Sequence, residues 1–371
     1  MKKLSVFVVG SVLLAAVVVC GMQVTAVTNS EPEGKLLMLT NEGELGESAA
    51  KRALWQGVCT YASEHGYKAW LVVRSENTVE ASLQALENSL SSSVVAVIGM
   101  GKDDETVFYE AQQRYPEISF LLVDGEPRRS TDSVYETRTN THCLLFRERE
   151  AGFLAGYAAV MDGKRHLGFC GQNAEPGVVR YGYGFIQGAE AAATTLGLGN
   201  GDITIQYWYL GADRKEDAIQ SVVSQWYQRG TEVIFVCDQE AQALTNAVIA
   251  TAKEVSGLVI ATDADQSMQG EVVLSSTVKD YAGQVYAALS ALEDNEGRWN
   301  AERAGRSFHV GVSEGAISLA KEPNAWRWKT FTPEAYEAVL SGLKQGAFVL
   351  DQSENRERLP LAPHCTVKMQ K

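Results

Sequence analysis

The sequence predicts an α/β protein of two lobes, each a mostly parallel sheet with helices on both faces. Three observations support this fold class. The chain has 371 residues, which is more than a single hydrophobic core usually serves. Apolar, β-rich runs alternate with helical patterns along most of its length. Several of these runs are apolar without interruption, as expected of strands that lie between two layers of helices.

Eight segments are the expected strands. Each is a short apolar run rich in β-branched or aromatic residues, and a turn or a helical pattern follows it. Their number favours two sheets over one. The expected strands are residues 35–40, 68–73, 94–98, 119–123, 167–170, 203–208, 232–236 and 258–262.

Three segments between or after these strands have helical periodicity. Residues 219–227 place apolar side chains at i, i+3, i+4, i+7 and i+8, which forms one stripe along a helix. Residues 50–61 repeat this spacing, and residues 281–292 follow it more loosely. Crossovers of this length between strands predict parallel pairing within each sheet.

The order of the elements predicts the lobe boundaries. A natural break lies at Thr141–Phe146, where one series of strands and helices ends and a second begins. We expect the first lobe to comprise residues 35–145 with about 264–305. We expect the second lobe to comprise residues 146–263 with about 306–371.

The first residues predict export. Two lysines precede an apolar run over residues 4–19, and this run is shorter than the roughly 18 residues of a spanning helix. Cys20 follows directly, so residues 1–20 are interpreted as a signal peptide with a candidate lipidation site at Cys20, and residues 21–34 as a tether. Simple cleavage after residues 24–26 is the alternative, because the residue before Cys20 is larger than usual. A retained membrane anchor would leave the domain on the same side.

Composition argues against nucleic acid as a partner. The chain has 33 Lys and Arg residues against 46 Asp and Glu residues, for a formal charge of −13. Such a protein repels phosphate backbones, and no cluster of basic residues offers a local exception.

Motifs for catalysis or for a cofactor are also missing from the sequence. The five histidines are isolated, and the five cysteines after Cys20 are scattered, which predicts neither a zinc site nor a disulfide framework. No GxSxG motif occurs, and the glycine-rich turn at residues 99–102 lacks the spacing of a phosphate-binding loop. We therefore expect no cofactor and no enzymatic activity.

Polar residues at strand ends are the candidate ligand-binding groups. Asn41, Asp124, Asp238, Asp263 and Asp265 each follow an expected strand. Ligands of open α/β sheets lie at the carboxyl ends of strands, where carboxylates can accept hydrogen bonds from ligand hydroxyls. The alternative for each is helix capping, since Asp and Asn are frequent at such turns.

Aromatic residues follow the glycine-bounded loop at residues 171–177. Tyr181, Tyr183 and Phe185 lie close together there, so one ring could stack on a planar ligand group. Packing in the core is the alternative for all three.

Several segments in order resemble the BMP (basic membrane protein) or PnrA-like family of ABC transporter solute-binding lipoproteins. The resemblance extends over about residues 36–348, and it depends on the order and spacing of the segments together. The matching segments are residues 115–124, 146–159, 167–171, 184–188, 232–235, 262–266 and 275–279.

This resemblance implies a type I periplasmic-binding-protein fold whose two lobes, joined by three hinge strands, close on a ligand, typically a purine nucleoside. It also implies an ABC permease as partner and a lipid anchor in the membrane. In the family, aromatic rings stack on the base and acids hold the ribose hydroxyls. By position, Asp124, Asp263 and Lys279 match the family's polar residues, Tyr181 stands where an aromatic ring is usual, and Asn41 stands at an aspartate position.

The sequence departs from the family at two places. Where the family has Asp-x-Ser-Phe-Asn at the start of its first helix, this chain has Glu-Ser-Ala-Ala-Lys at residues 47–51, without the stacking ring and the amide. Residues 238–241 replace the family's glycine-rich turn. We expect an extracytoplasmic receptor that binds a nucleoside-like solute for an ABC importer. A ligand sensor or regulator without a role in transport is the alternative.

Overall fold

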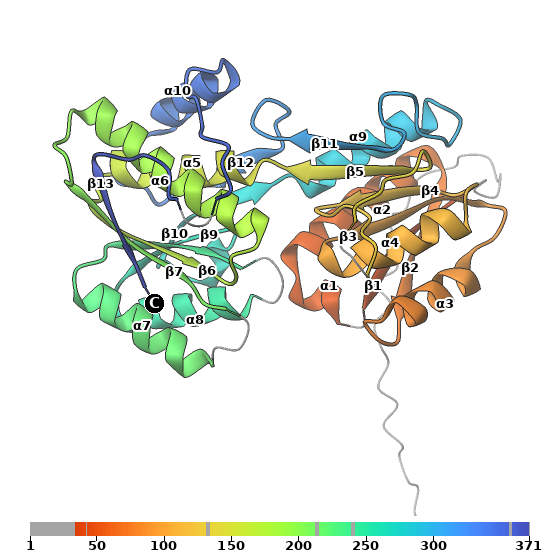
Figure 1. The fold of residues 1–371 in the computed structure, drawn as a ribbon, viewed down its shortest axis with the longest axis horizontal. Helices are drawn as coiled ribbons and strands as arrows, with labels where there is room; N and C mark the ends of the chain where they lie inside the picture. The colour runs from red at the N-terminus through yellow and green to blue at the C-terminus, as the bar shows by residue number, and fades with distance from the viewer. Residues whose placement is uncertain are drawn as a thin grey trace, which may run out of the picture. The chain divides into compact units, whose positions relative to one another are not determined.

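Two sheets, one of six strands and one of seven, organise the part of the chain that the structure describes (Figure 1). This computed structural model describes residues 34–41, 43–130, 134–211, 215–238, 242–355 and 358–370. The expected signal peptide, Cys20 and nearly all of the expected tether lie outside these ranges.

The first sheet has the strand order β11-β5-β4-β3-β1-β2, and every neighbouring pair is parallel. Its central strands are apolar on both faces, because helices cover both. The strands are β1 (Gly34–Asn41), β2 (Tyr67–Arg74), β3 (Val94–Met100), β4 (Ser119–Val123), β5 (Thr141–Phe146) and β11 (Arg306–Val310).

Alternate residues of β1 show how the two helix layers are separated. Leu36 and Met38 pack in the core shared with α2 and α9, while Leu37 and Leu39 pack in the core shared with α3 and α4. The helices of this lobe are α1 (Glu44–Glu47), α2 (Ala49–His65), α3 (Val79–Ser89), α4 (Lys102–Arg114) and α9 (Tyr281–Glu293).

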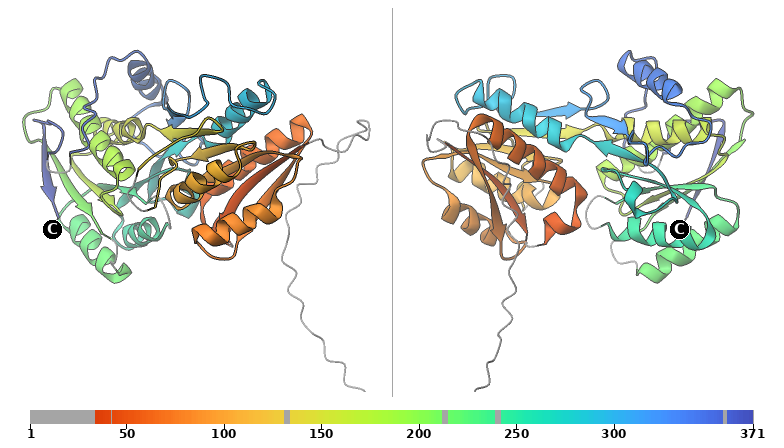
Figure 2. Two further views of the ribbon diagram at one scale, coloured as in Figure 1. Left: turned by 45° about the vertical axis from the view of Figure 1, so that its right-hand side comes forward. Right: turned by 180° about the vertical axis from the view of Figure 1, so that it is seen from behind.

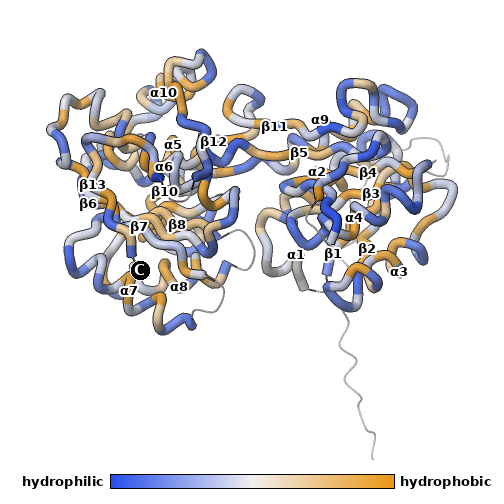
Figure 3. Tube along the Cα trace, viewed as in Figure 1, coloured by the Kyte–Doolittle hydropathy of each residue, from blue (hydrophilic) through white to orange (hydrophobic). Residues whose placement is uncertain are grey.

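The second sheet has the strand order β12-β10-β9-β8-β6-β7-β13, with only the β10–β12 pair antiparallel among its described pairs. Figure 3 shows hydrophobic stretches along strands of both sheets. The strands are β6 (His166–Gly171), β7 (Ile203–Tyr209), β8 (Val233–Cys237), β9 (Leu258–Ala261), β10 (Val273–Lys279), β12 (Ile317–Leu319) and β13 (Cys365–Met369).

Helices cover both faces of this second sheet as well. Phe169 and Phe235 share a core with α5 and α6, whereas Cys170 and Ile234 share a core with α7 and α8. Of the helices in the described ranges, none combines the length and the apolar character needed to cross a membrane. The helices are α5 (Glu148–Met161), α6 (Pro176–Leu196), α7 (Glu216–Gln228), α8 (Ala243–Val255) and α10 (Pro333–Lys344), with a short 3₁₀ helix at Ser267–Gln269.

Glycines bring α5 and α6 into close contact. A Cβ atom at Gly152 of α5 would lie 2.0 Å from the carbonyl oxygen of Tyr181, and one at Gly188 of α6 would lie 2.0 Å from that of Phe153. Side chains larger than hydrogen would therefore push the helices apart. This contact fixes the N-terminal half of α6, which carries Arg180 and Tyr181, against the start of α5.

The chain crosses from one sheet to the other three times: after β5, after β10 and after β11 (Figure 2). Backbone hydrogen bonds join these passages, since Arg147 N–H donates to the Val310 carbonyl at 2.9 Å and Asp280 N–H donates to the Ala316 carbonyl at 2.9 Å.

The eight expected strands are present, with ends within one or two residues of the predicted ones, but the sheets differ from the expected lobe boundaries. The predicted break at Thr141–Phe146 falls on strand β5, which was not among the expected strands and after which the chain leaves the first sheet for α5 of the second lobe. Residues 273–279 were expected in the first lobe and form β10 of the second sheet, while residues 306–310 were expected in the second lobe and form β11 of the first. The apolar pattern of a strand predicts that it is buried, but it does not predict which strand pairs with it.

Candidate functional site

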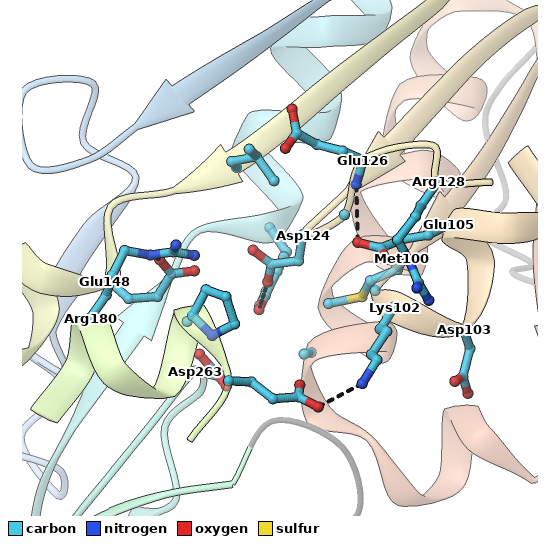
Figure 4. A pocket seen from close by; sticks show the side chains of 18 of the residues that line it. Met100, Lys102, Asp103, Glu105, Asp124, Glu126, Arg128, Glu148, Arg180 and Asp263 are labelled. Carbon is cyan, nitrogen blue, oxygen red and sulfur yellow. Dashed lines mark hydrogen bonds and ion pairs between the residues drawn. The ribbon is translucent and has the colours of Figure 1, made fainter. Parts of the chain in front are cut away.

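A cavity of about 470 Å³ lies where the carboxyl ends of strands from both sheets meet (Figure 4). Residues after β3, β4 and β9 line it, together with the first turns of α2, α4, α5, α6 and α9. The cavity thus lies at the strand ends where the sequence predicts the ligand-binding groups, and residues of both lobes line it. Lys51, at the position of the family's amide, is one of the lining residues.

Lys279, at the end of β10, does not line the cavity itself but is the centre of a buried charge cluster whose carboxylates do. Its side chain is 1% exposed, and its Nζ lies 2.9 Å from Asp124 Oδ2, 3.2 Å from Glu148 Oε1 and 3.6 Å from Asp263 Oδ1. Burial would lower the pKa of Lys279, but the three carboxylates outweigh it and raise that pKa above its ordinary value. The ammonium thus stays charged and joins carboxylates from both lobes.

Asp124 is the first-lobe member of this cluster. It follows β4 with φ 55°, a left-handed conformation that Asp tolerates better than most residues. Its Oδ2 accepts hydrogen bonds from Lys279 and, at 2.7 Å, from the Tyr281 hydroxyl. Burial raises the pKa of Asp124, and the nearby carboxylates of Glu148 and Asp263 add to this, against the lowering effect of Lys279.

Asp263 and Tyr181 form the second-lobe part of the cluster. Asp263 follows β9, also with positive φ (67°), and its Oδ1 accepts a hydrogen bond from the Tyr181 hydroxyl at 2.6 Å. The Tyr181 side chain is completely buried, with its ring edge-on to Phe235. The structure therefore places Tyr181 behind Asp263, where it orients the carboxylate, and its ring does not line the cavity.

Asp238 lies outside the central cluster. Its Oδ2 accepts hydrogen bonds from the backbone N–H groups of Leu244 at 2.8 Å and Thr245 at 3.4 Å, which is the capping role that the sequence left open. Together with Asp263, it also lines a smaller neighbouring cavity of about 20 Å³.

Asn41 belongs to a cluster of buried polar side chains within the first lobe. Its Oδ1 accepts a hydrogen bond from Arg74 Nε, and Arg74 Nη1 donates to Asp104 Oδ1 at 2.7 Å. Both Arg74 and Asp104 are almost completely buried. Asn41 thus contributes to the carboxyl edge of the first sheet, and it does not line the main cavity.

The sequence reasoning missed several charged residues of the site. Glu148 begins α5 and accepts hydrogen bonds from Lys279 and, at 2.7 Å, from Arg180 Nε. Burial raises the pKa of Glu148, but Lys279 and Arg180 outweigh it and lower that pKa overall. The charged run at residues 147–150 was the available signal, although its pattern alone is typical of any exposed first helical turn.

Ion pairs also lie at the edges of the cavity. Lys102, at the start of α4, contacts Glu175 before α6 at 2.6 Å, and this pair joins the two lobes. Arg128 contacts Glu105 at 3.1 Å within the first lobe, and Figure 4 shows this pair opposite Arg180 and Glu148.

Acidic side chains outnumber basic ones around the cavity, seven to four among the described lining residues. Such a surface offers hydrogen-bond acceptors to hydroxyl donors and repels anionic solutes. In the ranges that the structure describes, no cluster of His, Cys, Asp and Glu side chains fits a metal ion. The charged lining residues are Asp103, Glu105, Asp124, Glu126, Glu148, Glu175 and Asp263, with Lys51, Lys102, Arg128 and Arg180.

Comparison with known proteins identifies relatives of the same architecture. A family described as "ABC transporter substrate-binding protein PnrA-like" matches residues 35–334. A solute-binding protein of an ABC transporter system from Aeropyrum pernix K1 is 20% identical, with 86% of this chain and 88% of that chain covered and a TM-score of 0.58.

Two further structures have the same fold at lower identity. A solute-binding protein of an ABC transporter system from Conexibacter woesei DSM 14684 is 13% identical, with 86% and 99% of the two chains covered and a TM-score of 0.66. A transcriptional activator of the comK gene from Bacillus halodurans is 15% identical, with 88% and 100% covered and a TM-score of 0.63. At these identities the likeness establishes the fold, which is the type I periplasmic-binding-protein fold that the sequence predicted.

Proposed function

The chain belongs to the PnrA-like family of ABC transporter substrate-binding proteins, and from this premise we propose that its solute is a purine nucleoside or a closely similar small polar molecule. Proteins of this family act outside the cytoplasm, where they bind a small-molecule solute and work with an ABC permease.

The observation that carries the proposal is the convergence of Asp124 and Asp263 on Lys279 at the cavity. The two carboxylates come from different lobes, and both line the cavity. A vicinal pair of hydroxyls, such as that of ribose, can donate to acceptors placed in this way. Each hydrogen bond to a charged group contributes about 1.5–3 kcal/mol.

The base would need an apolar or aromatic seat elsewhere in the cavity. Ala50 lines the cavity in the region where the family places its stacking ring. Tyr135, which is 56% exposed and also lines the cavity, is the candidate replacement. Stacking on a single ring supports a planar base by about 1–3 kcal/mol.

Solute binding would favour the closed arrangement of the lobes. Because Asp124 and Asp263 belong to different lobes, a solute held by both is bound more tightly when the lobes are close. Binding therefore shifts the population toward closure, and the closed form is the one delivered to the permease.

We further propose that Cys20 carries the lipid that holds the receptor at the membrane. The position of this cysteine after the apolar run supports the proposal. Metabolic labelling with a clickable fatty acid would label the wild-type protein and leave Cys20→Ala unlabelled. Equal labelling of both proteins would contradict the assignment.

Calorimetric titration of the purified protein with inosine, guanosine and adenosine tests the nucleoside proposal. We expect binding of at least one of them, and a roughly 10- to 150-fold loss of affinity in Asp124→Asn or Asp263→Asn. Asp265→Asn is the matched control, because this carboxylate follows the same strand as Asp263 but accepts hydrogen bonds from Ser267. No heat with any of the three nucleosides would refute the proposal.

A further inference from the structure

Arg180 is a lining residue of the cavity whose guanidinium is held by two carboxylates. Its Nε donates to Glu148 Oε2 at 2.7 Å, and its Nη1 donates to Glu354 Oε1 at 2.9 Å. Its side chain is 30% exposed. Within the described part of the chain, no hydrogen bond involves Nη2, which leaves this nitrogen as the donor for a bound solute.

Both partners of Arg180 are themselves fixed. Glu148 accepts a hydrogen bond from Lys279 in the buried cluster. Glu354 belongs to the segment 351–355, which Arg149 holds through hydrogen bonds to its backbone carbonyls and which Tyr183 holds at the Asn355 carbonyl. A guanidinium held in this way loses little further freedom when it binds a solute.

A guanidinium donates hydrogen bonds and accepts none, so the solute atom facing Arg180 must be an acceptor. An anionic acceptor fits poorly, since acidic side chains dominate the lining and both Lys102 and Arg128 already pair with carboxylates. A neutral carbonyl oxygen fits this surrounding better. The hydroxyls of a sugar, by contrast, find acceptors at Asp124 and Asp263.

We propose that Arg180 is a specificity-determining residue that donates a hydrogen bond to a carbonyl oxygen of the base, so that the cleft prefers 6-oxopurine nucleosides to adenosine. This inference rests on the proposed nucleoside function. At the same position, the 6-amino group of adenosine would direct N–H donors at the guanidinium, and a site built to donate rejects a partner that cannot accept.

Affinities for inosine, guanosine and adenosine, measured by calorimetry on the full protein, test this inference. We expect the wild-type protein to bind inosine and guanosine roughly 10- to 150-fold more tightly than adenosine. In Arg180→Met the ratio of the inosine affinity to the adenosine affinity should fall toward one, because inosine binding weakens while adenosine binding changes little. The ratio is the readout, since a general disturbance of the site would weaken all three nucleosides together.

Two further variants sharpen the test. Glu354→Gln acts from outside the cavity by loosening Arg180, so the ratio should fall by several-fold even if Arg180→Met does not fold. Arg147→Met is the control, because Arg147 also pairs with two carboxylates, Glu150 and Glu314, but does not line the cavity. This control should keep the wild-type ratio.

The outcomes separate the two proposals. If nucleosides bind without a preference for the 6-oxo group, or if Arg180→Met keeps the wild-type preference, the role of Arg180 is refuted and the nucleoside function stands. If no nucleoside binds, the nucleoside function fails, and the role of Arg180 in base selection fails with it.

Discussion

Replacing Lys279 with methionine should strongly destabilise the protein. The side chain is 1% exposed and within 3.6 Å of three carboxylates, so the variant keeps Asp124, Glu148 and Asp263 buried without their shared cation. Removing one partner of a buried ion pair costs about 3–5 kcal/mol. Because Arg180 still pairs with Glu148, we expect a loss near the lower end of this range in the free energy of unfolding.

The loss should depend on pH in a defined direction. Burial already raises the pKa of Asp124 in the folded protein, and without Lys279 this pKa rises further. The pKa of Glu148, which Lys279 and Arg180 hold below its ordinary value, rises as well when Lys279 is removed. A carboxylate whose pKa is higher in the folded state than in the unfolded state binds protons more tightly when folded, so acid favours folding. The difference in the free energy of unfolding between wild type and variant should therefore be largest above neutral pH and should shrink as the pH falls toward 5.

Urea unfolding of both proteins at pH 7.5 and pH 5.5 measures these differences. Lys321→Met is the matched control: Lys321 contacts Glu337 at 2.8 Å, but the two side chains are 52% and 64% exposed. An exposed pair of this kind contributes about 0–1 kcal/mol. A loss in Lys279→Met no larger than that of the control, or an equal loss at both pH values, would refute the role of Lys279 as the shared cation of the cluster.

Three other predictions concern helix packing, a buried histidine and the contact between the lobes. Gly188→Ala should cost about 1–3 kcal/mol in urea unfolding, because the added Cβ would lie 2.0 Å from the Phe153 carbonyl oxygen. His142 is buried, and burial lowers its pKa to about 4, so the wild-type protein should lose about 2 kcal/mol of stability between pH 7 and pH 5 that His142→Gln does not lose. Lys102→Glu and Glu175→Lys should each speed solute dissociation, about two- to tenfold in stopped flow, and the double variant with both charges reversed should restore the wild-type dissociation rate.

Each of these predictions has a control or a result that contradicts it. Gly46→Ala should leave stability unchanged or raise it, since nothing lies within 4 Å of a Cβ atom there. The pKa of His142 is lower in the folded protein than in the unfolded chain, so its contribution to stability is full above pH 6.5 and is lost as the pH falls. Equal pH dependence of stability in wild type and His142→Gln would contradict this prediction. Lys321→Glu should leave dissociation unchanged, and failure of the double reversal to restore the wild-type rate contradicts the contact between Lys102 and Glu175.

The sequence predicted the local elements well because their signals are local. The apolar runs of β1, β3 and β4 are buried on both faces, and the stripe at residues 219–227 lies within α7. Strand β5 was not among the expected strands, although the expected break lies where this strand ends and a helix of the other lobe begins. The partners of β10 and β11 are far away in the sequence, and no local pattern encodes such pairing.

The site was predicted in part, for a related reason. Asp124 and Asp263 were selected by strand-end position and by family resemblance, and Lys279 by resemblance alone; the structure brings the three together. Asp238 was selected by its strand-end position, and it caps a helix. Tyr181 was selected as an aromatic residue after a loop and by resemblance, and it is buried behind a carboxylate. Only the tertiary arrangement separates a strand-end acid that lines the cavity from one that satisfies backbone N–H groups.

The cluster also explains how one cleft can present two acceptors to the same solute. Lys279 contacts Asp124 and Asp263 together, while Tyr181 and Tyr281 each donate to one of them. Burial raises the pKa of Asp124, and the ammonium of Lys279 opposes this rise. We expect this opposition to keep the Asp124 carboxylate charged near neutral pH, so that solute binding is accompanied by little proton uptake or release. Calorimetry in buffers of different ionisation enthalpy should then give the same heat after correction for the buffer. A proton released for each solute bound would contradict this expectation, because it would show that Asp124 holds a proton in the free protein.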